Sequence, residues 1–160
     1  LGLPFDEAMR VERIFISPEP GGAQCECGRI RLETGEGIVG DRNFGKHVYP
    51  GQNITLVEAE EIERFCRAHG RRADLAMTRR NLVTRGIGLN KLVGKTFTIG
   101  TAQLEGVELC EPCASLGKAL ADESFSAAAV IRHWTGHGGL RANVVGSGEI
   151  DVGASIRVVA

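Results

Sequence analysis

Two cysteines three residues apart, Cys110 and Cys113, lie in the stretch LCEPCASL (109–116). The stretch follows an alternating segment typical of a strand, and the residues after Cys113 favour a helix. Cys113 is therefore expected at a helix N-terminus, where amide N–H groups and the helix dipole favour a thiolate. Pro112 fixes the entry to the helix and has no competing N–H. We expect Cys113 to be a reactive thiolate, with Cys110 as a resolving partner or a spectator.

The five cysteines allow other interpretations. A thioredoxin-type redox pair needs a βαβ context that the rest of the chain does not supply. A zinc site built from Cys25, Cys27, Cys110 and Cys113 is an alternative, although CxC is a less usual half-site than CxxC. A buried, inert thiol is a third interpretation. It suits Cys66, on the apolar face of a predicted helix, better than Cys113.

A basic cluster, TRRNLVTRG (78–86), gathers Arg79, Arg80 and Arg85 around Asn81. Guanidinium forks bind phosphate or carboxylate in a bidentate way, and an amide adds directional hydrogen bonds. The cluster therefore predicts an anion site, with a solvated surface as the alternative. In GHGGLRANV (136–144), two glycines would let the backbone approach a ligand within reach of Arg141.

The segment GEGIVG (35–40) matches the glycine spacing of dinucleotide-binding loops. Those loops open a helix, whereas Pro50 and several glycines follow here, so we expect a structural turn. The loop that follows carries Arg42 and His47, either of which is a candidate ligand. The neighbouring Asp41 favours a structural pair with Arg42 as the alternative.

The remaining patterns predict many short strands and a few helices. Strands are expected at 11–18, 81–86, 95–100, 102–110 and, in three pieces, 140–160. A strand running into a glycine-rich turn is expected at 28–41, and a strand followed by a helix that ends at Gly70 is expected at 52–70. Further helices are expected at 74–79, after Cys113, and at 124–134 with Ser124 as the N-cap. No strand–helix–strand alternation of a doubly wound sheet is found. We predict a mainly β (α+β) fold, a mostly antiparallel β-barrel with a few peripheral helices.

Composition is typical of a soluble globular chain that forms a single domain over residues 1–160. A net charge of −1 gives no general attraction to nucleic acid or to a membrane, and neither is an expected partner. The first ten residues lack the pattern of a signal peptide, and the odd number of cysteines argues against a disulfide framework. A cytoplasmic location is expected.

Taken together, the motifs resemble the MOSC domain, the C-terminal domain of molybdenum-cofactor sulfurases, which also occurs as a stand-alone protein. The resemblance covers roughly residues 11–159. It rests on GEGIVGDRNFGKH, ITLVEAEEIE, RRNLVTRGIGLNKLVGKTFTIG, LEGVELCEPCASL and GGLRANVVGSGEIDVGASI, in that order.

The resemblance implies a β-barrel with one key cysteine that carries sulfur as a persulfide or ligates molybdenum. By motif position this cysteine is Cys113, which would then be the metal ligand. The Arg-x-Asn pattern that contacts the pterin and phosphate of the molybdenum cofactor falls on Arg79 and Asn81. A pyridoxal-phosphate domain supplies the sulfur in sulfurases. No pyridoxal-phosphate site is expected in this chain, so a cysteine desulfurase or sulfurase would act in trans.

We therefore expect a MOSC protein that binds molybdenum cofactor or carries sulfur on Cys113, with Arg42, His47 and Arg141 as further ligands. Sulfurtransferase-like or cofactor-dependent activity would follow. One alternative is a molybdenum-dependent reductase of N-hydroxylated compounds that needs an electron-donating partner. Another is a non-enzymatic, zinc-stapled binding domain.

Overall fold

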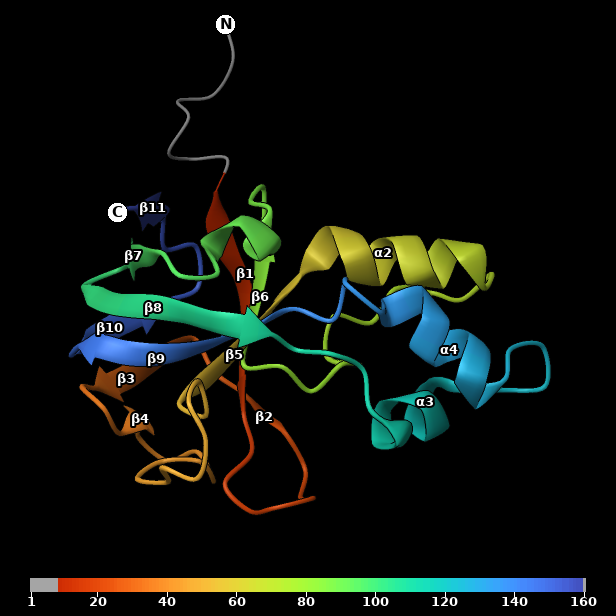
Figure 1. Ribbon diagram of the computed structural model, residues 1–160, viewed down its shortest axis with the longest axis horizontal. Coiled ribbons are helices and arrows are strands. Elements are labelled where there is room, and N and C mark those ends of the chain that lie inside the picture. Colours follow the sequence, from red (N-terminus) through yellow and green to blue (C-terminus); the bar gives the residue numbers. More distant parts are fainter. Residues whose placement is uncertain (1–8, 160) are drawn as a thin grey trace, which may run out of the picture.

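The computed structural model describes residues 9–159, so most of the N-terminal decapeptide lies outside the described residues. Figure 1 shows a curled sheet with the α-helices gathered beside it. The order of elements is β1 (Arg10–Ile16), β2 (Cys25–Glu26), β3 (Arg29–Glu33), β4 (Gly37–Ile38), β5 (Ile54–Glu58), α2 (Ala59–Ala68), β6 (Leu82–Arg85), the 3₁₀ turn η1 (Leu89–Leu92), β7 (Thr96–Ile99), β8 (Ala102–Leu109), α3 (Ala114–Leu120), α4 (Ala127–Trp134), β9 (Leu140–Gly146), β10 (Gly148–Asp151) and β11 (Ile156–Val158).

The larger sheet has the strand order β11-β7-β8-β9-β5-β6-β1-β2, and β10-β3-β4 form a smaller sheet. The larger sheet curls back on itself, because Val11 and Arg10 of β1, the strand next to β2, pair with Ala154 and Ser155 just before β11 at the opposite end. This contact curls the sheet into a barrel-like shape. All pairings between named strands are antiparallel except β5 with β6, which α2 connects in parallel. The predicted mainly β, mostly antiparallel fold is therefore confirmed, with one parallel pair of strands, β5 and β6, that the sequence analysis did not predict.

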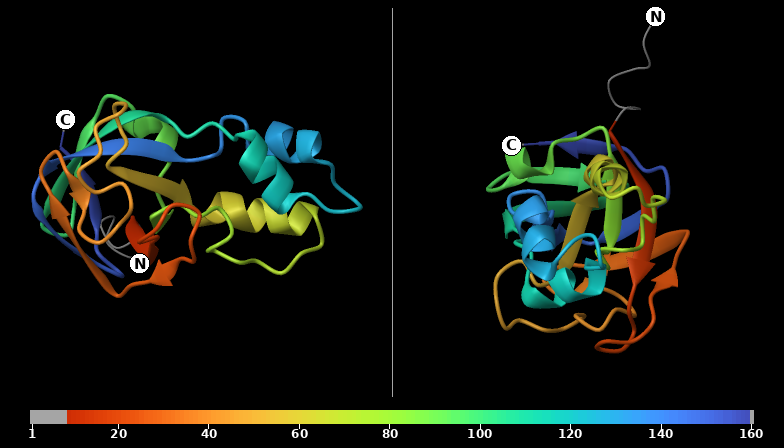
Figure 2. Two further views of the ribbon diagram at one scale, coloured as in Figure 1. Left: turned by 90° about the horizontal axis from the view of Figure 1, so that it is seen from below. Right: turned by 90° about the vertical axis from the view of Figure 1, so that its right-hand side faces the viewer.

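Two apolar clusters stabilise the fold. The first fills the curled sheet with side chains such as Ile14, Leu56 and Leu104, which are buried completely. The second joins the helices to the outer side of β5 and β6 around Phe65 and Trp134. Figure 2 shows that the helices project from one end of the barrel as a separate layer.

The helices follow local sequence signals. In α2 the buried residues recur at helical spacing and include Cys66, which is 1% exposed, as predicted for an inert thiol. Helix α4 begins later than expected: Ser126, not Ser124, accepts a hydrogen bond from the Ala129 N–H and is the N-cap. The helix predicted over 74–79 is a turn. Among the described residues, no helix is both long and apolar enough to cross a membrane.

Candidate functional site

The segment before β6 holds an unusual backbone. Arg79 has a φ of 59°, and it is the only residue other than glycine with a positive φ within residues 9–159. This left-handed conformation is unfavourable for a residue with a long side chain. The guanidinium of Arg79 donates to Ser17 Oγ at 3.2 Å and to the Gly22 carbonyl at 2.5 Å, which fixes its direction. The chain therefore places this arginine at a conformational cost.

Arg79 lines a small cavity of about 180 Å³ at the end of the barrel, here called the inner pocket. Its wall is formed by Ser17, Asp41, Arg42, Asn43, Tyr49, Thr55, Arg79, Arg80, Asn81, Cys110 and Arg141. Four arginines thus face one carboxylate. The Asp41 carboxylate already accepts the N–H groups of Ser17 and Asn43, at 2.9 and 3.2 Å. The excess of positive charge suits an anionic ligand.

A second cavity of about 360 Å³, the outer pocket, adjoins the first, because both are lined by Arg42, Arg79 and Arg80. Cys113 and Ser115, from the start of α3, form another part of its wall, with Gly21, Met77, Thr78, Leu116 and Ala119. Among residues 9–159, no aspartate or glutamate lines the outer pocket. Cys113 therefore shares one wall with three arginines, and no carboxylate of the described residues in that wall balances their positive charge.

The surroundings of Cys113 favour its thiolate. The residue is exposed and is the N-cap of α3. The backbone amide of Leu116 is the main cause that lowers the pKa of Cys113, and Ser115 and the Arg80 guanidinium act in the same direction. A lowered pKa increases the fraction of nucleophilic thiolate at neutral pH. The position of Cys113 at the start of a helix is as predicted, and its role as a reactive thiolate stays a prediction.

Cys110 differs from Cys113 although only two residues separate them. It follows the last residue of β8 and is 2% exposed. Burial raises the pKa of the Cys110 thiol, and the charges of Arg80 and Arg141 offset this only in part. Cys110 is therefore a neutral thiol in the wall of the inner pocket, while Cys113 lines the outer one.

Asn81 lines the inner pocket, but its side chain already bonds within the fold. Its Oδ1 accepts the N–H of Thr55 at 3.0 Å and the Thr55 hydroxyl at 3.2 Å. Its Nδ2 donates to the Phe15 carbonyl at 3.0 Å. The amide thus joins β1, β5 and the start of β6. The ligand role that the resemblance implies for Asn81 stays a prediction, beside a structural role that the hydrogen bonds show.

The other arginines differ in how they are held. Arg141 on β9 donates to Glu108 at 3.0 Å and lies 5.0 Å from the centre of the Tyr49 ring. Arg80 donates through Nε to the Gly138 carbonyl at 3.1 Å. The Arg42 side chain has no hydrogen bond or ion pair with any residue in the described range 9–159. Arg80 belongs to the basic cluster that predicted an anion site, although the family resemblance assigned only Arg79 and Asn81 of that cluster to the cofactor.

The two glycines before β9 are required by the fold. A Cβ on Gly138 would lie 2.0 Å from the Cys110 carbonyl oxygen, and one on Gly139 would lie 2.0 Å from that of Leu56. This packing accounts for both glycines, and their predicted approach to a ligand stays a prediction. Their close packing holds the segment before β9 against the end of β8.

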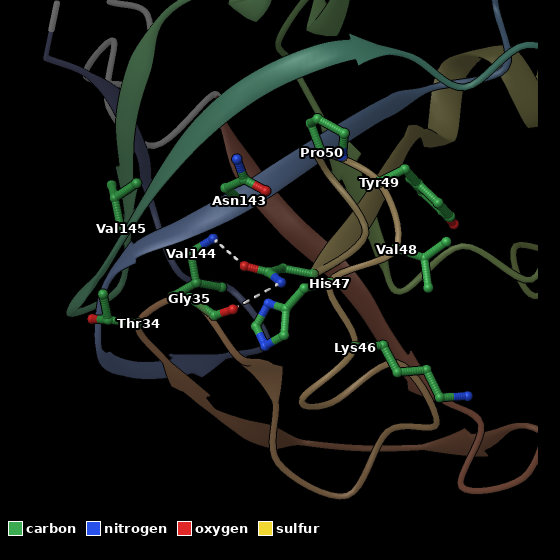
Figure 3. Close-up of a pocket in the computed structure, with 11 residues that line it drawn as sticks. Thr34, Gly35, Lys46, His47, Val48, Tyr49, Pro50, Asn143, Val144 and Val145 are labelled. Carbon is green, nitrogen blue, oxygen red and sulfur yellow. Dashed lines mark hydrogen bonds between the residues drawn. The ribbon is translucent and has the colours of Figure 1, made fainter.

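His47 lies apart from the arginines. Figure 3 shows it in a third cavity, of about 590 Å³, with Val48, Pro50 and Val144. Its Nε2 is 3.3 Å from a carboxylate oxygen of Glu36. Among the cavities described here, only Tyr49 belongs to the walls of both this one and the inner pocket. The structure therefore does not bring His47 together with Arg42, and its role as a ligand stays a prediction.

The zinc interpretation finds no support in the geometry. In the described part of the chain, no three histidine, cysteine, aspartate or glutamate side chains are grouped to hold a metal ion. Cys25, on β2, lies by a shallow cavity with Pro18 and Glu19, away from the walls that contain Cys110 and Cys113. The four cysteines are thus not gathered into one site.

These features define a class: a curled, mostly antiparallel sheet that presents a cysteine thiolate beside an arginine-lined anion pocket. The chain belongs to the MOSC domain family, whose sequence model matches residues 43–157. The matched region contains both Cys110 and Cys113 and three of the pocket arginines; Arg42 directly precedes it. No curated protein matches the chain.

Solved structures share the fold at low sequence identity. The YuaD protein from Bacillus subtilis has a TM-score of 0.81 and 21% identity, with 94% of each chain covered. YiiM from Geobacillus stearothermophilus has a TM-score of 0.73 and 16% identity, over 95% of this chain and 75% of that one. YiiM from Escherichia coli has a TM-score of 0.68 and 22% identity, over 94% and 70%.

Proposed function

We propose that this MOSC protein carries sulfur as a persulfide on Cys113. One observation carries the proposal: an exposed thiol with a lowered pKa shares the outer pocket with Arg42, Arg79 and Arg80, and no carboxylate from the described part of the chain lines that pocket. A thiolate is the form of cysteine that attacks sulfur, and a persulfide is itself an anion. The same guanidinium groups would therefore stabilise both the Cys113 thiolate, which is the reactant, and the Cys113 persulfide anion, which is the product.

Binding of molybdenum cofactor is a second candidate, supported by the two adjoining pockets. The outer pocket, at about 360 Å³, lies within the usual size range of a small-molecule site, and the inner pocket extends it. The donor set fits the group: arginines from the shared wall would hold its phosphate, and Cys113 would offer a thiolate to the metal. When bound, the cofactor would supply a redox-active metal centre. The N-hydroxy reductase alternative depends on this binding.

The test is native mass spectrometry with metal analysis of the wild type, Cys113→Ser and the matched control Cys110→Ser. Each protein is analysed as purified and after incubation with a pyridoxal-phosphate-dependent cysteine desulfurase and L-cysteine. We expect one added sulfur atom on the wild type and on Cys110→Ser, and none on Cys113→Ser. Molybdenum with a pterin mass that depends on Cys113 would favour the second candidate. Sulfur that loads equally on Cys113→Ser would refute the first.

A further inference from the structure

The outer pocket has more hydrogen-bond donors than the protein itself uses. Arg42 has no side-chain partner within residues 9–159, and Arg80 is held only through Nε. Thr78, in the same wall, is 3% exposed, and its hydroxyl has no hydrogen-bond partner among the described residues. A buried hydroxyl without a partner is costly and needs an explanation.

This set of groups specifies the chemistry of a ligand. Several guanidinium N–H donors and a hydroxyl in the wall of the outer pocket favour binding of a compact anion with several oxygen acceptors. The thiolate in the same wall could attack an electrophilic atom of that ligand. A sulfane-sulfur oxyanion combines both features, because one end is an oxyanion and the other a sulfur atom that a thiolate can attack.

We propose that the outer pocket binds a sulfane-sulfur oxyanion of the thiosulfate class, and that Cys113 takes the outer sulfur of this donor. The inference rests on the proposed persulfide function and names its sulfur source. It differs from loading by a pyridoxal-phosphate enzyme, whose persulfide carries no oxyanion for the arginines and Thr78 to bind.

The reaction balances without a further reagent. The Cys113 thiolate attacks the outer sulfur of thiosulfate, and a new S–S bond forms while the S–S bond of thiosulfate breaks. The bonding electron pair leaves with the sulfite dianion, so the outer sulfur is transferred and Cys113 becomes a persulfide anion. The total charge is the same before and after, and no proton, oxidant or reductant takes part. Arg42, Arg79 and Arg80 stabilise the charge that develops on the departing sulfite, and Thr78 positions one of its oxygens.

The experiment uses the whole protein, freed of bound sulfur, with thiosulfate as the probe. Persulfide is measured by mass spectrometry and released sulfite by a colour reaction, for the wild type, Thr78→Val and Thr98→Val. Valine keeps the shape of threonine and removes the hydroxyl. Thr98 on β7 lines a different cavity and is the matched control. Thermal unfolding confirms that each variant is folded.

We expect the wild type and Thr98→Val to gain one sulfur per chain and to release an equal amount of sulfite. Thr78→Val should show a KM for thiosulfate about tenfold higher, because a hydrogen bond to a charged oxygen is lost. Loading by cysteine desulfurase should be equal in the wild type and in Thr98→Val. An unchanged KM in Thr78→Val would overturn the assignment of this pocket. If the desulfurase loads sulfur onto the wild type and thiosulfate does not, this inference alone is overturned. If neither donor loads sulfur, the proposed function is overturned as well.

Discussion

Replacing Asn81 with alanine should lower the free energy of unfolding by about 3 kcal/mol, even with no ligand present. The change leaves the Thr55 N–H and the Phe15 carbonyl without their side-chain partner. Asn81 is 8% exposed, so water replaces these bonds poorly. A buried polar group without a partner costs roughly 1–3 kcal/mol, and two such groups give the expected loss.

Urea denaturation of the metal-free protein measures this effect. The urea concentration at half-unfolding should decrease, while the dependence of the unfolding free energy on urea concentration stays the same. Asn143→Ala is the matched control: among the residues that the structure describes, its Oδ1 accepts one hydrogen bond, from the Gly51 N–H at 2.9 Å, and about 1 kcal/mol should be lost. A loss below 1 kcal/mol in Asn81→Ala, together with weaker binding of molybdenum cofactor, would refute the structural role. Asn81 would then be the ligand that the family resemblance implies.

Four further outcomes are expected. The alkylation rate of Cys113 should stay high at pH values below about 8.5, the usual pKa of cysteine, and should fall only when the pH drops through the lowered pKa of Cys113. Cys110 should not react in the folded protein, and equal alkylation rates at the two cysteines would contradict this expectation. Thr78→Val should stabilise the ligand-free protein by about 1 kcal/mol in urea, since an unpaired hydroxyl is removed. Arg79→Gly should relieve a left-handed backbone and leave stability equal or higher, yet weaken binding of thiosulfate; a loss of stability would show that its side-chain bonds dominate. Burial lowers the pKa of His133, so the unfolded chain binds a proton more readily than the folded one. The free energy of unfolding should therefore fall as pH decreases through the unfolded pKa of about 6.5, and His133→Gln should lose this pH dependence.

Local patterns in the sequence predicted much of the fold, because they depend on residues close in the chain. The alternation over β7 and β8 and the helical spacing of α2 each report which face is buried. Cys113 was placed at a helix start for the same reason. The N-cap of α4 was wrong by two residues, because Ser124 and Ser126 are both suitable caps and Ser124 instead bonds to Asp122.

The parts that sequence reasoning missed depend on contacts between distant segments. Asn81 and Arg79 are both polar and close in sequence, but Asn81 turns inward to Phe15 and Thr55, which lie 66 and 26 residues away. His47 and Arg42 are near in sequence, yet the loop takes them to different cavities. β5 and β6 can pair in parallel because α2 carries the chain back to the end of the sheet where β5 begins. The residue pattern within either strand does not reveal this pairing.

The difference between Cys110 and Cys113 explains the CEPC motif better than a redox pair does. A dithiol pair exchanges readily when its attacking thiol is accessible and its partner can ionise. Here burial disfavours the ionised form of Cys110, and the amides at the start of α3 favour that of Cys113. The strand end and the helix start therefore give the two sulfurs different chemistry. A persulfide formed on Cys113 would face a neutral buried thiol, which attacks slowly, and this arrangement would let the sulfur persist until an external acceptor arrives.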